Sequence, residues 1–185
     1  MSLELRRAVF LDRDDTININ VPYLGDPEKV QILPTVPESL RRLQEAGFAL
    51  FVVSNQSGVG RGLITKAQVE SVYAEIFRHL GWNPFLHVYN CYAAPGDPYG
   101  AEERKPSPAM LLQAAREFNI DLPRSFMIGD RGSDIMAGKN AGCRSLLILN
   151  GRDPNTLSET GKKADRISNT LSDATDWILS VSTPQ

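Results

Sequence analysis

Short β-rich runs alternate with helical patterns along the chain, and this alternation limits the fold more than any other sequence feature. The first run covers residues 8–11, and others follow at 48–53, 86–92, 124–128 and 145–149. The run at 48–53 is apolar throughout, as in a strand that is buried on both faces of a parallel sheet. Helical segments between runs are typical of βαβ units. The sequence therefore predicts an α/β fold with a doubly wound, Rossmann-like parallel sheet flanked by helices.

The segments between these runs carry the signals that start and end helices. Residues 37–46 begin with a proline and are followed by a glycine. Apolar residues recur at helical spacing between Thr65 and Gly81, and Ser107 opens a further helix. A shorter helix runs to about Asn140, and the polar tail ends in a helix around Trp177. With no internal repeat and no linker, residues 1–185 are expected to form a single domain.

Composition excludes several classes of partner. The chain has 20 Lys and Arg against 22 Asp and Glu, a net charge of −2, so no basic surplus favours nucleic acid. No apolar run approaches the roughly 20 residues that span a bilayer, so no membrane partner is expected. Glu4 and two arginines stand where a signal peptide needs apolar residues. Cys91 and Cys143 cannot build a disulfide framework, and a cytoplasmic location is expected.

Polar side chains follow directly after three of the predicted strands. Asp12 and Asp14 follow the first strand, Ser54 and Asn55 the second, and Asp130 the fourth. The carboxyl ends of parallel strands meet at one edge of a sheet, so these groups should surround one crevice. Helix starts at that edge favour an anion. Converging carboxylates repel one another unless a hard cation lies between them, and oxygen ligands of this kind suit Mg²⁺.

These groups fit the chemistry of phosphoryl transfer. The Asp12 carboxylate can attack phosphorus and carry the phosphoryl group as an aspartyl phosphate. Asp14 can protonate the leaving oxygen and later deprotonate the attacking water. Ser54 and Lys105 can neutralise the charge on the transferring group, as Mg²⁺ can from the other side. The predicted partner is therefore a small phosphorylated metabolite.

The same residues carry a resemblance to a known superfamily, which extends from about residue 8 to 149. Asp12-x-Asp14-x-Thr16, Ser54, Lys105 and Gly129-Asp130-xxx-Asp134 resemble, in this order, the four motifs of haloacid-dehalogenase-like (HAD) phosphatases. Within that superfamily, one branch contains D-glycero-D-manno-heptose 1,7-bisphosphate phosphatases and histidinol-phosphate phosphatases. The segments that resemble this branch are Leu11-Asp12-Arg13-Asp14, Asn55-Gln56-Ser57-Gly58, Arg61-Gly62 and Arg104-Lys105-Pro106.

The resemblance implies a mechanism and a set of site residues. It implies Mg²⁺-dependent hydrolysis through Asp12, in a core without a large cap domain. Mg²⁺ would be held by Asp12, the backbone carbonyl of Asp14, and Asp130, with Thr16 and Asp134 in supporting positions. The expected substrate contacts are Asn20, Tyr23, Asn55, Arg104 and Arg131.

Two departures from the pattern of this branch stand out. Asp15 occupies a position where the family usually has glycine, and Asp adopts positive φ less freely than Gly. The branch also commonly carries a Cys-x-His and Cys-x-Cys zinc loop. Here only Cys91 remains, with Ala93 at the histidine position and Ala101 and Glu103 at the positions of the later cysteines. One thiolate cannot complete a tetrahedral zinc site, so no structural zinc is expected.

Several alternatives stay open at this point. The substrate could be a heptose bisphosphate, histidinol phosphate, or another small phosphorylated sugar or alcohol. A non-enzymatic phosphoacceptor domain would use a similar acid pair, but its acceptor follows a later strand and its lysine follows every acid. A binding protein that kept the fold but lost catalysis is a further alternative. Such a protein would not need every catalytic side chain, and all of them are present here. The glycine-rich segment 58–62 is expected to be a flexible loop. The chain is expected to be a monomer.

Overall fold

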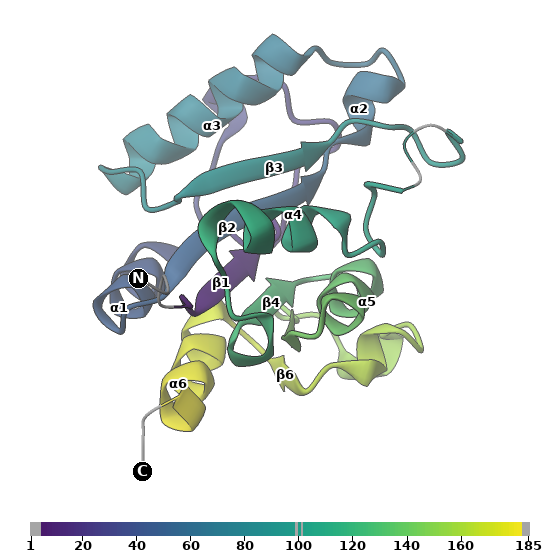
Figure 1. Cartoon of the computed structure of the whole chain (residues 1–185). Helices are drawn as coiled ribbons and strands as arrows, with labels where there is room; N and C mark the ends of the chain where they lie inside the picture. The colour runs from purple at the N-terminus through teal and green to yellow at the C-terminus, as the bar shows by residue number, and fades with distance from the viewer. Residues whose placement is uncertain (1–4, 99, 101, 183–185) are drawn as a thin grey trace.

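Six parallel strands form one sheet in the computed structural model, which describes residues 5–98, 100 and 102–182 (Figure 1). The strands are β1 (Ala8–Leu11), β2 (Ala49–Asn55), β3 (His87–Cys91), β4 (Phe126–Gly129), β5 (Arg144–Ile148) and β6 (Arg166–Ser168). Their order across the sheet is β3-β2-β1-β4-β5-β6. The winding direction therefore reverses between β1 and β4, where α/β sheets of this kind bind their ligands.

Helices connect the strands and cover the sheet. The described α-helices are α1 (Val36–Glu45), α2 (Ser57–Gly60), α3 (Lys66–Leu80), α4 (Ala109–Phe118), α5 (Gly132–Ala141) and α6 (Leu171–Ser182). Short 3₁₀ turns lie at η1 (Pro27–Lys29), η2 (Leu122–Arg124), η3 (Pro154–Thr156) and η4 (Gly161–Lys163). The predicted α/β fold with a doubly wound parallel sheet is confirmed.

Strand side chains alternate between two apolar layers, one on each face of the sheet. Val9 and Leu11 of β1 pack into the layer that contains α1, α3 and α6. Ala8 and Phe10 pack into the opposite layer, with α4 and α5. All four side chains are fully buried, because β1 is covered by helices on both faces. This buried central strand therefore fixes the position of Asp12, the residue that follows it.

Helix α3 begins and ends as its sequence predicts. The Thr65 side chain accepts a hydrogen bond from the Gln68 N–H, and the Gln68 side chain accepts one from the Thr65 N–H. This reciprocal pair is a capping box. At the other end Gly81 has a φ of 81°, in the left-handed region that favours glycine. The buried face of α3 includes Tyr73, which lies near the site described below.

Two sequence expectations differ from the structure. Strand β6 was not predicted, because two of its three residues are exposed and it has no apolar run. The prediction of a flexible loop at 58–62 is wrong for its first part, which belongs to the short helix α2. A Cβ atom at Gly60 would lie 2.5 Å from the carbonyl oxygen of Tyr92, so this glycine permits a close backbone approach.

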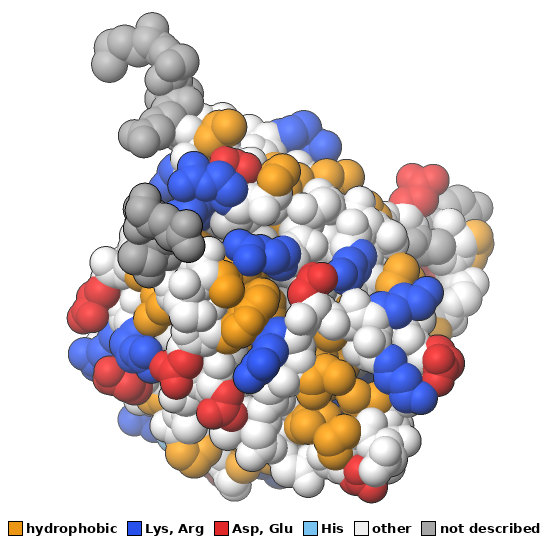
Figure 2. All heavy atoms as spheres, turned by 90° about the horizontal axis from the view of Figure 1, so that it is seen from below, with side chains coloured by type: hydrophobic (Ala, Val, Ile, Leu, Met, Phe, Trp, Pro, Cys, Tyr) orange, Lys and Arg blue, Asp and Glu red, His pale blue; other side chains and the backbone are white. Residues whose placement is uncertain are grey.

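The face of the molecule seen in Figure 2 has charges of both signs. Lys and Arg side chains are interspersed there with Asp and Glu, and hydrophobic side chains lie between them. Such a mixed surface gives this face no field of a single sign. Among the described residues, no helix has the length and apolar character needed to cross a bilayer.

Candidate active site

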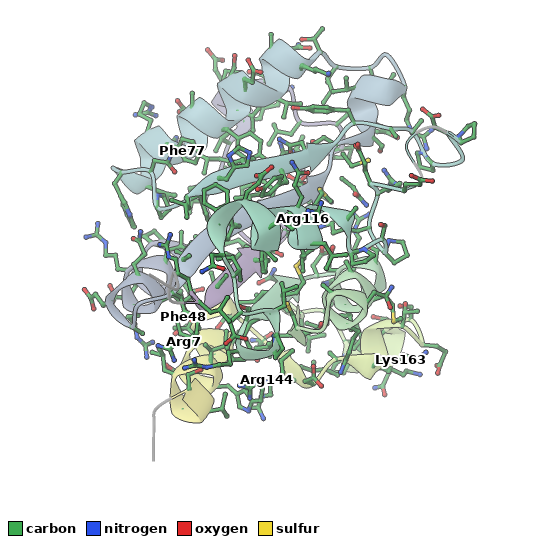
Figure 3. All side chains as sticks on the ribbon, in the orientation of Figure 1. Arg7, Phe48, Phe77, Arg116, Arg144 and Lys163 are labelled. Carbon is green, nitrogen blue, oxygen red and sulfur yellow. The ribbon has the colours of Figure 1, made fainter. Side chains whose placement is uncertain are left out.

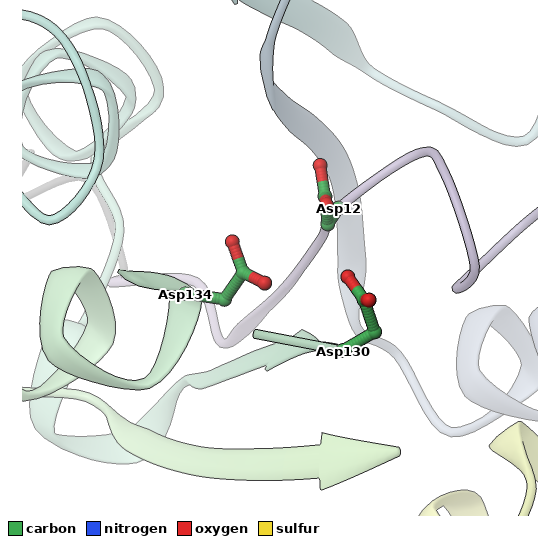
Figure 4. A group of neighbouring side chains, drawn as sticks. All are labelled: Asp12, Asp130 and Asp134. Atoms are coloured by element: carbon green, nitrogen blue, oxygen red, sulfur yellow. The ribbon is translucent and has the colours of Figure 1, made fainter. Parts of the chain in front are cut away.

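Three carboxylates converge at the reversal point between β1 and β4. Asp12 directly follows β1, Asp130 directly follows β4, and Asp134 lies in the first turn of α5 (Figure 4). One carboxylate oxygen from each residue lies within 4.8 Å of the other two, and all three residues are buried. Carboxylates this close repel one another unless cations lie among them.

The buried ammonium group of Lys105 is one such cation. Its Nζ atom donates to Asp12 Oδ1 at 2.9 Å, to Asp134 Oδ1 at 2.7 Å and to the Val53 carbonyl oxygen at 2.7 Å. Burial alone would lower the pKa of Lys105, but the charges of Asp12 and Asp134 outweigh it and hold this pKa above its usual value. Lys105 therefore stays charged and joins two of the three carboxylates.

Asp134 is held from two sides. Its Oδ1 atom faces Lys105, and its Oδ2 atom accepts a hydrogen bond from the Arg131 N–H at the start of α5, at 2.9 Å. A Cβ atom at Gly129 would lie 2.4 Å from the Asp134 side chain, so only glycine allows this approach. Both oxygens of Asp134 are thus engaged by the protein itself.

Asp130, in contrast, has an oxygen without a partner. Its Oδ1 atom is buried and makes no hydrogen bond with the described residues, while Oδ2 lies 3.4 Å from Arg152 Nη1. Burial, and then repulsion from Asp12 and Asp134, raises the pKa of Asp130 to about 7. An unpartnered carboxylate oxygen in an acidic cluster suits a hard cation, so the donor set fits Mg²⁺, and Asp12 and Asp130 are the candidate ligands.

This environment predicts how pH affects the metal-free protein. A buried carboxyl whose pKa rises on folding binds more protons in the folded state, so stability falls as pH increases from 3.8 to about 7. Over this pH range, the titration of Asp130 should lower the free energy of unfolding by about 4 kcal/mol. Urea unfolding in EDTA across this range measures it, and Asp130→Asn should remove most of it. Parallel curves for the variant and the wild type would contradict this account.

Asp14 lies beside the cluster and is held by several donors. Its Oδ1 atom accepts hydrogen bonds from Arg13 Nε at 3.0 Å and Asn18 Nδ2 at 3.1 Å. Its Oδ2 atom accepts from Arg13 Nη2 at 2.9 Å and Gln56 Nε2 at 3.3 Å. The side chain is nevertheless 23% exposed, so it remains open to a ligand.

The two polar residues at the end of β2 differ in what they contact. Ser54 Oγ is buried and accepts a hydrogen bond from Gln56 Nε2 at 2.9 Å. The Asn55 side chain donates to the Lys105 carbonyl oxygen and accepts from the Lys105 N–H, both at 3.1 Å. Asn55 therefore fixes the segment that carries Lys105 against the sheet. It was predicted as a substrate contact, and the structure adds this positioning contact.

Two adjoining hollows collect most of the predicted site residues. The first, of about 170 Å³, is lined by Asp12, Asp14, Asn20, Ser54, Asn55, Ser57, Arg104, Lys105, Arg131, Ser133 and Asp134. The second, of about 390 Å³, shares Asp14 and Arg104 and adds Tyr23 and Arg61. Its size is within the usual range for small-molecule sites. Thr16 and Asp130, which are both buried, line neither hollow.

The backbone conformation of Asp15 explains why the family usually has glycine at this position. Its φ is 55°, in the left-handed region, which Asp tolerates better than most residues. Its Oδ1 atom accepts a hydrogen bond from the Asn20 N–H at 3.0 Å, which stabilises the turn. The carboxyl group of Asp15 is therefore engaged locally.

Sequence reasoning missed several polar side chains of the site. Arg13 and Gln56 are direct neighbours in sequence of predicted site residues, so their position was the available signal. Arg152 has no local signal, because it lies in the polar segment after β5. Its Nη2 atom donates to the carbonyl oxygens of Asp130 and Ile148, both at 2.8 Å, and joins the ends of β4 and β5.

This fold, with acids after β1 and β4 and a buried lysine that joins Asp12 to Asp134, defines a HAD-like hydrolase. A family model described as HAD-hydrolase-like matches residues 102–174. The chain is 37% identical over 151 residues to the D-glycero-beta-D-manno-heptose-1,7-bisphosphate 7-phosphatase of Helicobacter pylori, covering 80% of this chain and 86% of that one. It is 32% identical to the protein of that name from Haemophilus ducreyi, covering 94% and 98%. The chain therefore belongs to this family of HAD-like phosphatases.

A solved structure supports the same assignment. The D,D-heptose 1,7-bisphosphate phosphatase of B. bronchiseptica, complexed with magnesium and phosphate, matches with a TM-score of 0.81 and 27% identity. The match covers 95% of this chain and 99% of that chain. The predicted HAD resemblance and hydrolase class are confirmed.

Proposed function

We propose that the chain is a Mg²⁺-dependent phosphatase that hydrolyses a small phosphate monoester, with D-glycero-D-manno-heptose 1,7-bisphosphate as its substrate. One observation carries the proposal. Asp12 lies 2.9 Å from the buried Lys105 ammonium and in one cluster with the unpartnered Asp130 oxygen. A nucleophile, a fixed positive charge and a metal ligand thus meet in one cluster, and Asp12 and Lys105 line the first hollow. The names of the relatives supply the substrate.

In the proposed reaction Asp12 is the nucleophile. A carboxylate oxygen of Asp12 forms a bond to phosphorus, and the ester P–O bond breaks. Asp14 gives a proton to the leaving oxygen, so the alcohol departs neutral. Lys105 offsets the charge on the transferring group and orients Asp12. Asp12, the Asp14 backbone carbonyl and Asp130 would hold Mg²⁺, which would supply further positive charge at the phosphoryl group.

The second half of the reaction regenerates the enzyme. A water molecule attacks phosphorus of the aspartyl phosphate, and Asp14 accepts its proton. Inorganic phosphate leaves and the Asp12 carboxylate is free again. Ser54 is positioned by Gln56 to donate a hydrogen bond to the phosphoryl group.

The second hollow supports a substrate with more than one anionic group. Arg61, Arg104 and Arg131 line it, and guanidinium groups bind phosphate through paired hydrogen bonds. Arg131 is well placed for this, since its side chain is 63% exposed. Asn20 and Tyr23 lie at the same hollow and complete the proposed substrate contacts. A bisphosphate fits such a site better than a singly charged ester.

We also propose that the chain carries no structural zinc. Cys91 is buried, and burial raises the pKa of its thiol, which disfavours the thiolate that zinc requires. A Cβ atom at Gly100 would lie 1.8 Å from Ala93 Cβ, so the loop packs closely at the expected histidine position. Arg104 Nη1 donates to the Ala93 carbonyl oxygen at 3.1 Å, a contact that holds the loop without metal.

A substrate panel tests the proposed function. Phosphate release from heptose 1,7-bisphosphate should exceed that from histidinol phosphate and from simple sugar monophosphates. Treatment with EDTA should abolish release and added Mg²⁺ should restore it, because two ligand carboxylates are then again paired with a cation. Elemental analysis of fresh protein should find no stoichiometric zinc. If histidinol phosphate were the preferred substrate, the proposed substrate would be wrong. Activity in excess EDTA would contradict the metal dependence.

The working unit is proposed to be a cytoplasmic monomer. All the groups named above come from one chain, so no second copy is needed to complete the site. Both cysteines, Cys91 and Cys143, are free thiols in the structure, which suits a reducing compartment. Gel filtration with light scattering measures the oligomeric state.

A further inference from the structure

Arg13 is the largest fully buried side chain in the described part of the protein, with 1% of its surface exposed. Its Nε and Nη2 atoms donate to the two oxygens of Asp14, at 3.0 and 2.9 Å, in a paired arrangement. Burying a guanidinium group costs several kcal/mol unless its partner geometry is good. Asp14 provides that geometry, and the pair holds both carboxylate oxygens at once.

Helix α3 fixes the position of Arg13 in turn. The guanidinium carbon lies 5.5 Å from the centre of the Tyr73 ring, within the range of a cation–π contact. The Tyr73 hydroxyl donates to Asn90 Oδ1 at 2.9 Å, which ties α3 to β3. Arg13 is therefore held on one side by a rigid aromatic ring and directs its donors at Asp14 on the other.

The remaining donors to Asp14 differ in strength. Asn18 Nδ2 is 3.1 Å from Oδ1, whereas Gln56 Nε2 is 3.3 Å from Oδ2, the longest of the four contacts. The Gln56 contact is therefore the one that gives way most easily to a substrate oxygen at Oδ2. Gln56 keeps its shorter bond to Ser54, at 2.9 Å. Arg13 holds both carboxylate oxygens, while the Asp14 side chain as a whole is 23% exposed and lines the first hollow.

We infer that Arg13 is a positioning residue, whose paired hydrogen bonds orient the Asp14 carboxyl group for proton transfer to the leaving oxygen of the substrate. The inference rests on the proposed function, because it assigns Arg13 a part in that reaction. Lysine cannot replace it, since an ammonium group is a single point donor and does not fix both oxygens. Proton transfer needs hydrogen-bond geometry at the leaving oxygen, so a freely rotating Asp14 would be a poor acid.

The dependence on the leaving group tests this role. An alkoxide needs a proton to depart, whereas p-nitrophenolate departs without one. Arg13→Met keeps an unbranched side chain but removes the guanidinium group, and it should lower kcat/KM for heptose 1,7-bisphosphate about 100-fold. It should lower kcat/KM for p-nitrophenyl phosphate by less than about fivefold. The ratio kcat/KM is the proper measure, because it excludes the later hydrolysis of the phosphoenzyme. Arg13→Lys should behave like Arg13→Met.

Arg7 offers a matched control. Its guanidinium carbon lies 4.6 Å from the centre of the Phe48 ring, and it donates to the Ala46 carbonyl oxygen at 3.0 Å (Figure 3). It thus has a ring contact like that of Arg13, but near the amino end of β2, away from the site. Arg7→Met should change kcat/KM for both esters equally and only slightly.

A double-mutant cycle keeps the test decisive where Arg13→Met is less stable. If Arg13 acts through Asp14, adding Arg13→Met to Asp14→Asn should cause no further loss with the alkyl ester. Equal losses on both esters, or additive losses in the cycle, would overturn the inference while the proposed function stands. Hydrolysis of neither ester by the wild-type protein would overturn the proposed function itself.

Discussion

Asp12→Asn is expected to abolish phosphate release while the protein remains folded. The amide is nearly isosteric with the carboxylate but is not a competent nucleophile, so kcat should fall at least about 10⁴-fold. Stability should not fall, because the change removes one of three clustered negative charges. Lys105 keeps its contacts with Asp134 and the Val53 carbonyl oxygen. Phosphate release with heptose 1,7-bisphosphate and thermal unfolding in EDTA measure the two effects.

Asp15→Asn is the matched control for this variant. Asn also tolerates the left-handed φ of 55° and can accept the same hydrogen bond from the Asn20 N–H. Activity should therefore change less than about threefold. Near-normal turnover by Asp12→Asn would rule out the aspartyl-phosphate route, and a large loss in Asp15→Asn would show that the second carboxyl group takes part.

The central half of the fold was predictable from sequence because its strands are buried on both faces. Strand β1, at Ala8–Leu11, lies where the first apolar run predicted it, and β2 differs by one or two residues at each end. Edge strand β6 was missed, since Ile167 is partly exposed and its neighbours are polar. A sequence pattern of apolar residues reveals a strand only where its side chains are buried. An edge strand of three residues has few buried side chains.

The candidate site was predictable to the extent that it follows from strand ends. Asp12 and Asp130 meet because β1 and β4 are neighbours in the sheet, which the doubly wound topology implies. The side chains that contact these acids could not be predicted in the same way. Arg152 reaches Asp130 from a segment without regular structure, and Asn55 engages the backbone of a residue 50 positions away. Such long-range contacts depend on the packed structure and leave no local pattern.

Lys105→Met is expected to destabilise the protein and to inactivate it. The change leaves Asp12 and Asp134 buried without their common cation, and breaking a buried ion pair from one side costs about 3–5 kcal/mol. Burial already raises the pKa of Asp134 with Lys105 present. Without Lys105 this pKa rises further, so the loss of stability should be larger at pH 8 than at pH 5, where protonation relieves it.

Urea unfolding in EDTA at the two pH values measures this effect against a surface pair. Lys139 lies 2.5 Å from Asp165, but both side chains are about one third exposed, so Lys139→Met should cost no more than about 1 kcal/mol. Adding Asp134→Asn to Lys105→Met removes one of the two orphaned charges and should regain part of the stability without regaining activity. Recovery of both together would mean that Lys105 serves only the fold, whereas stability without turnover identifies its charge as part of phosphoryl transfer.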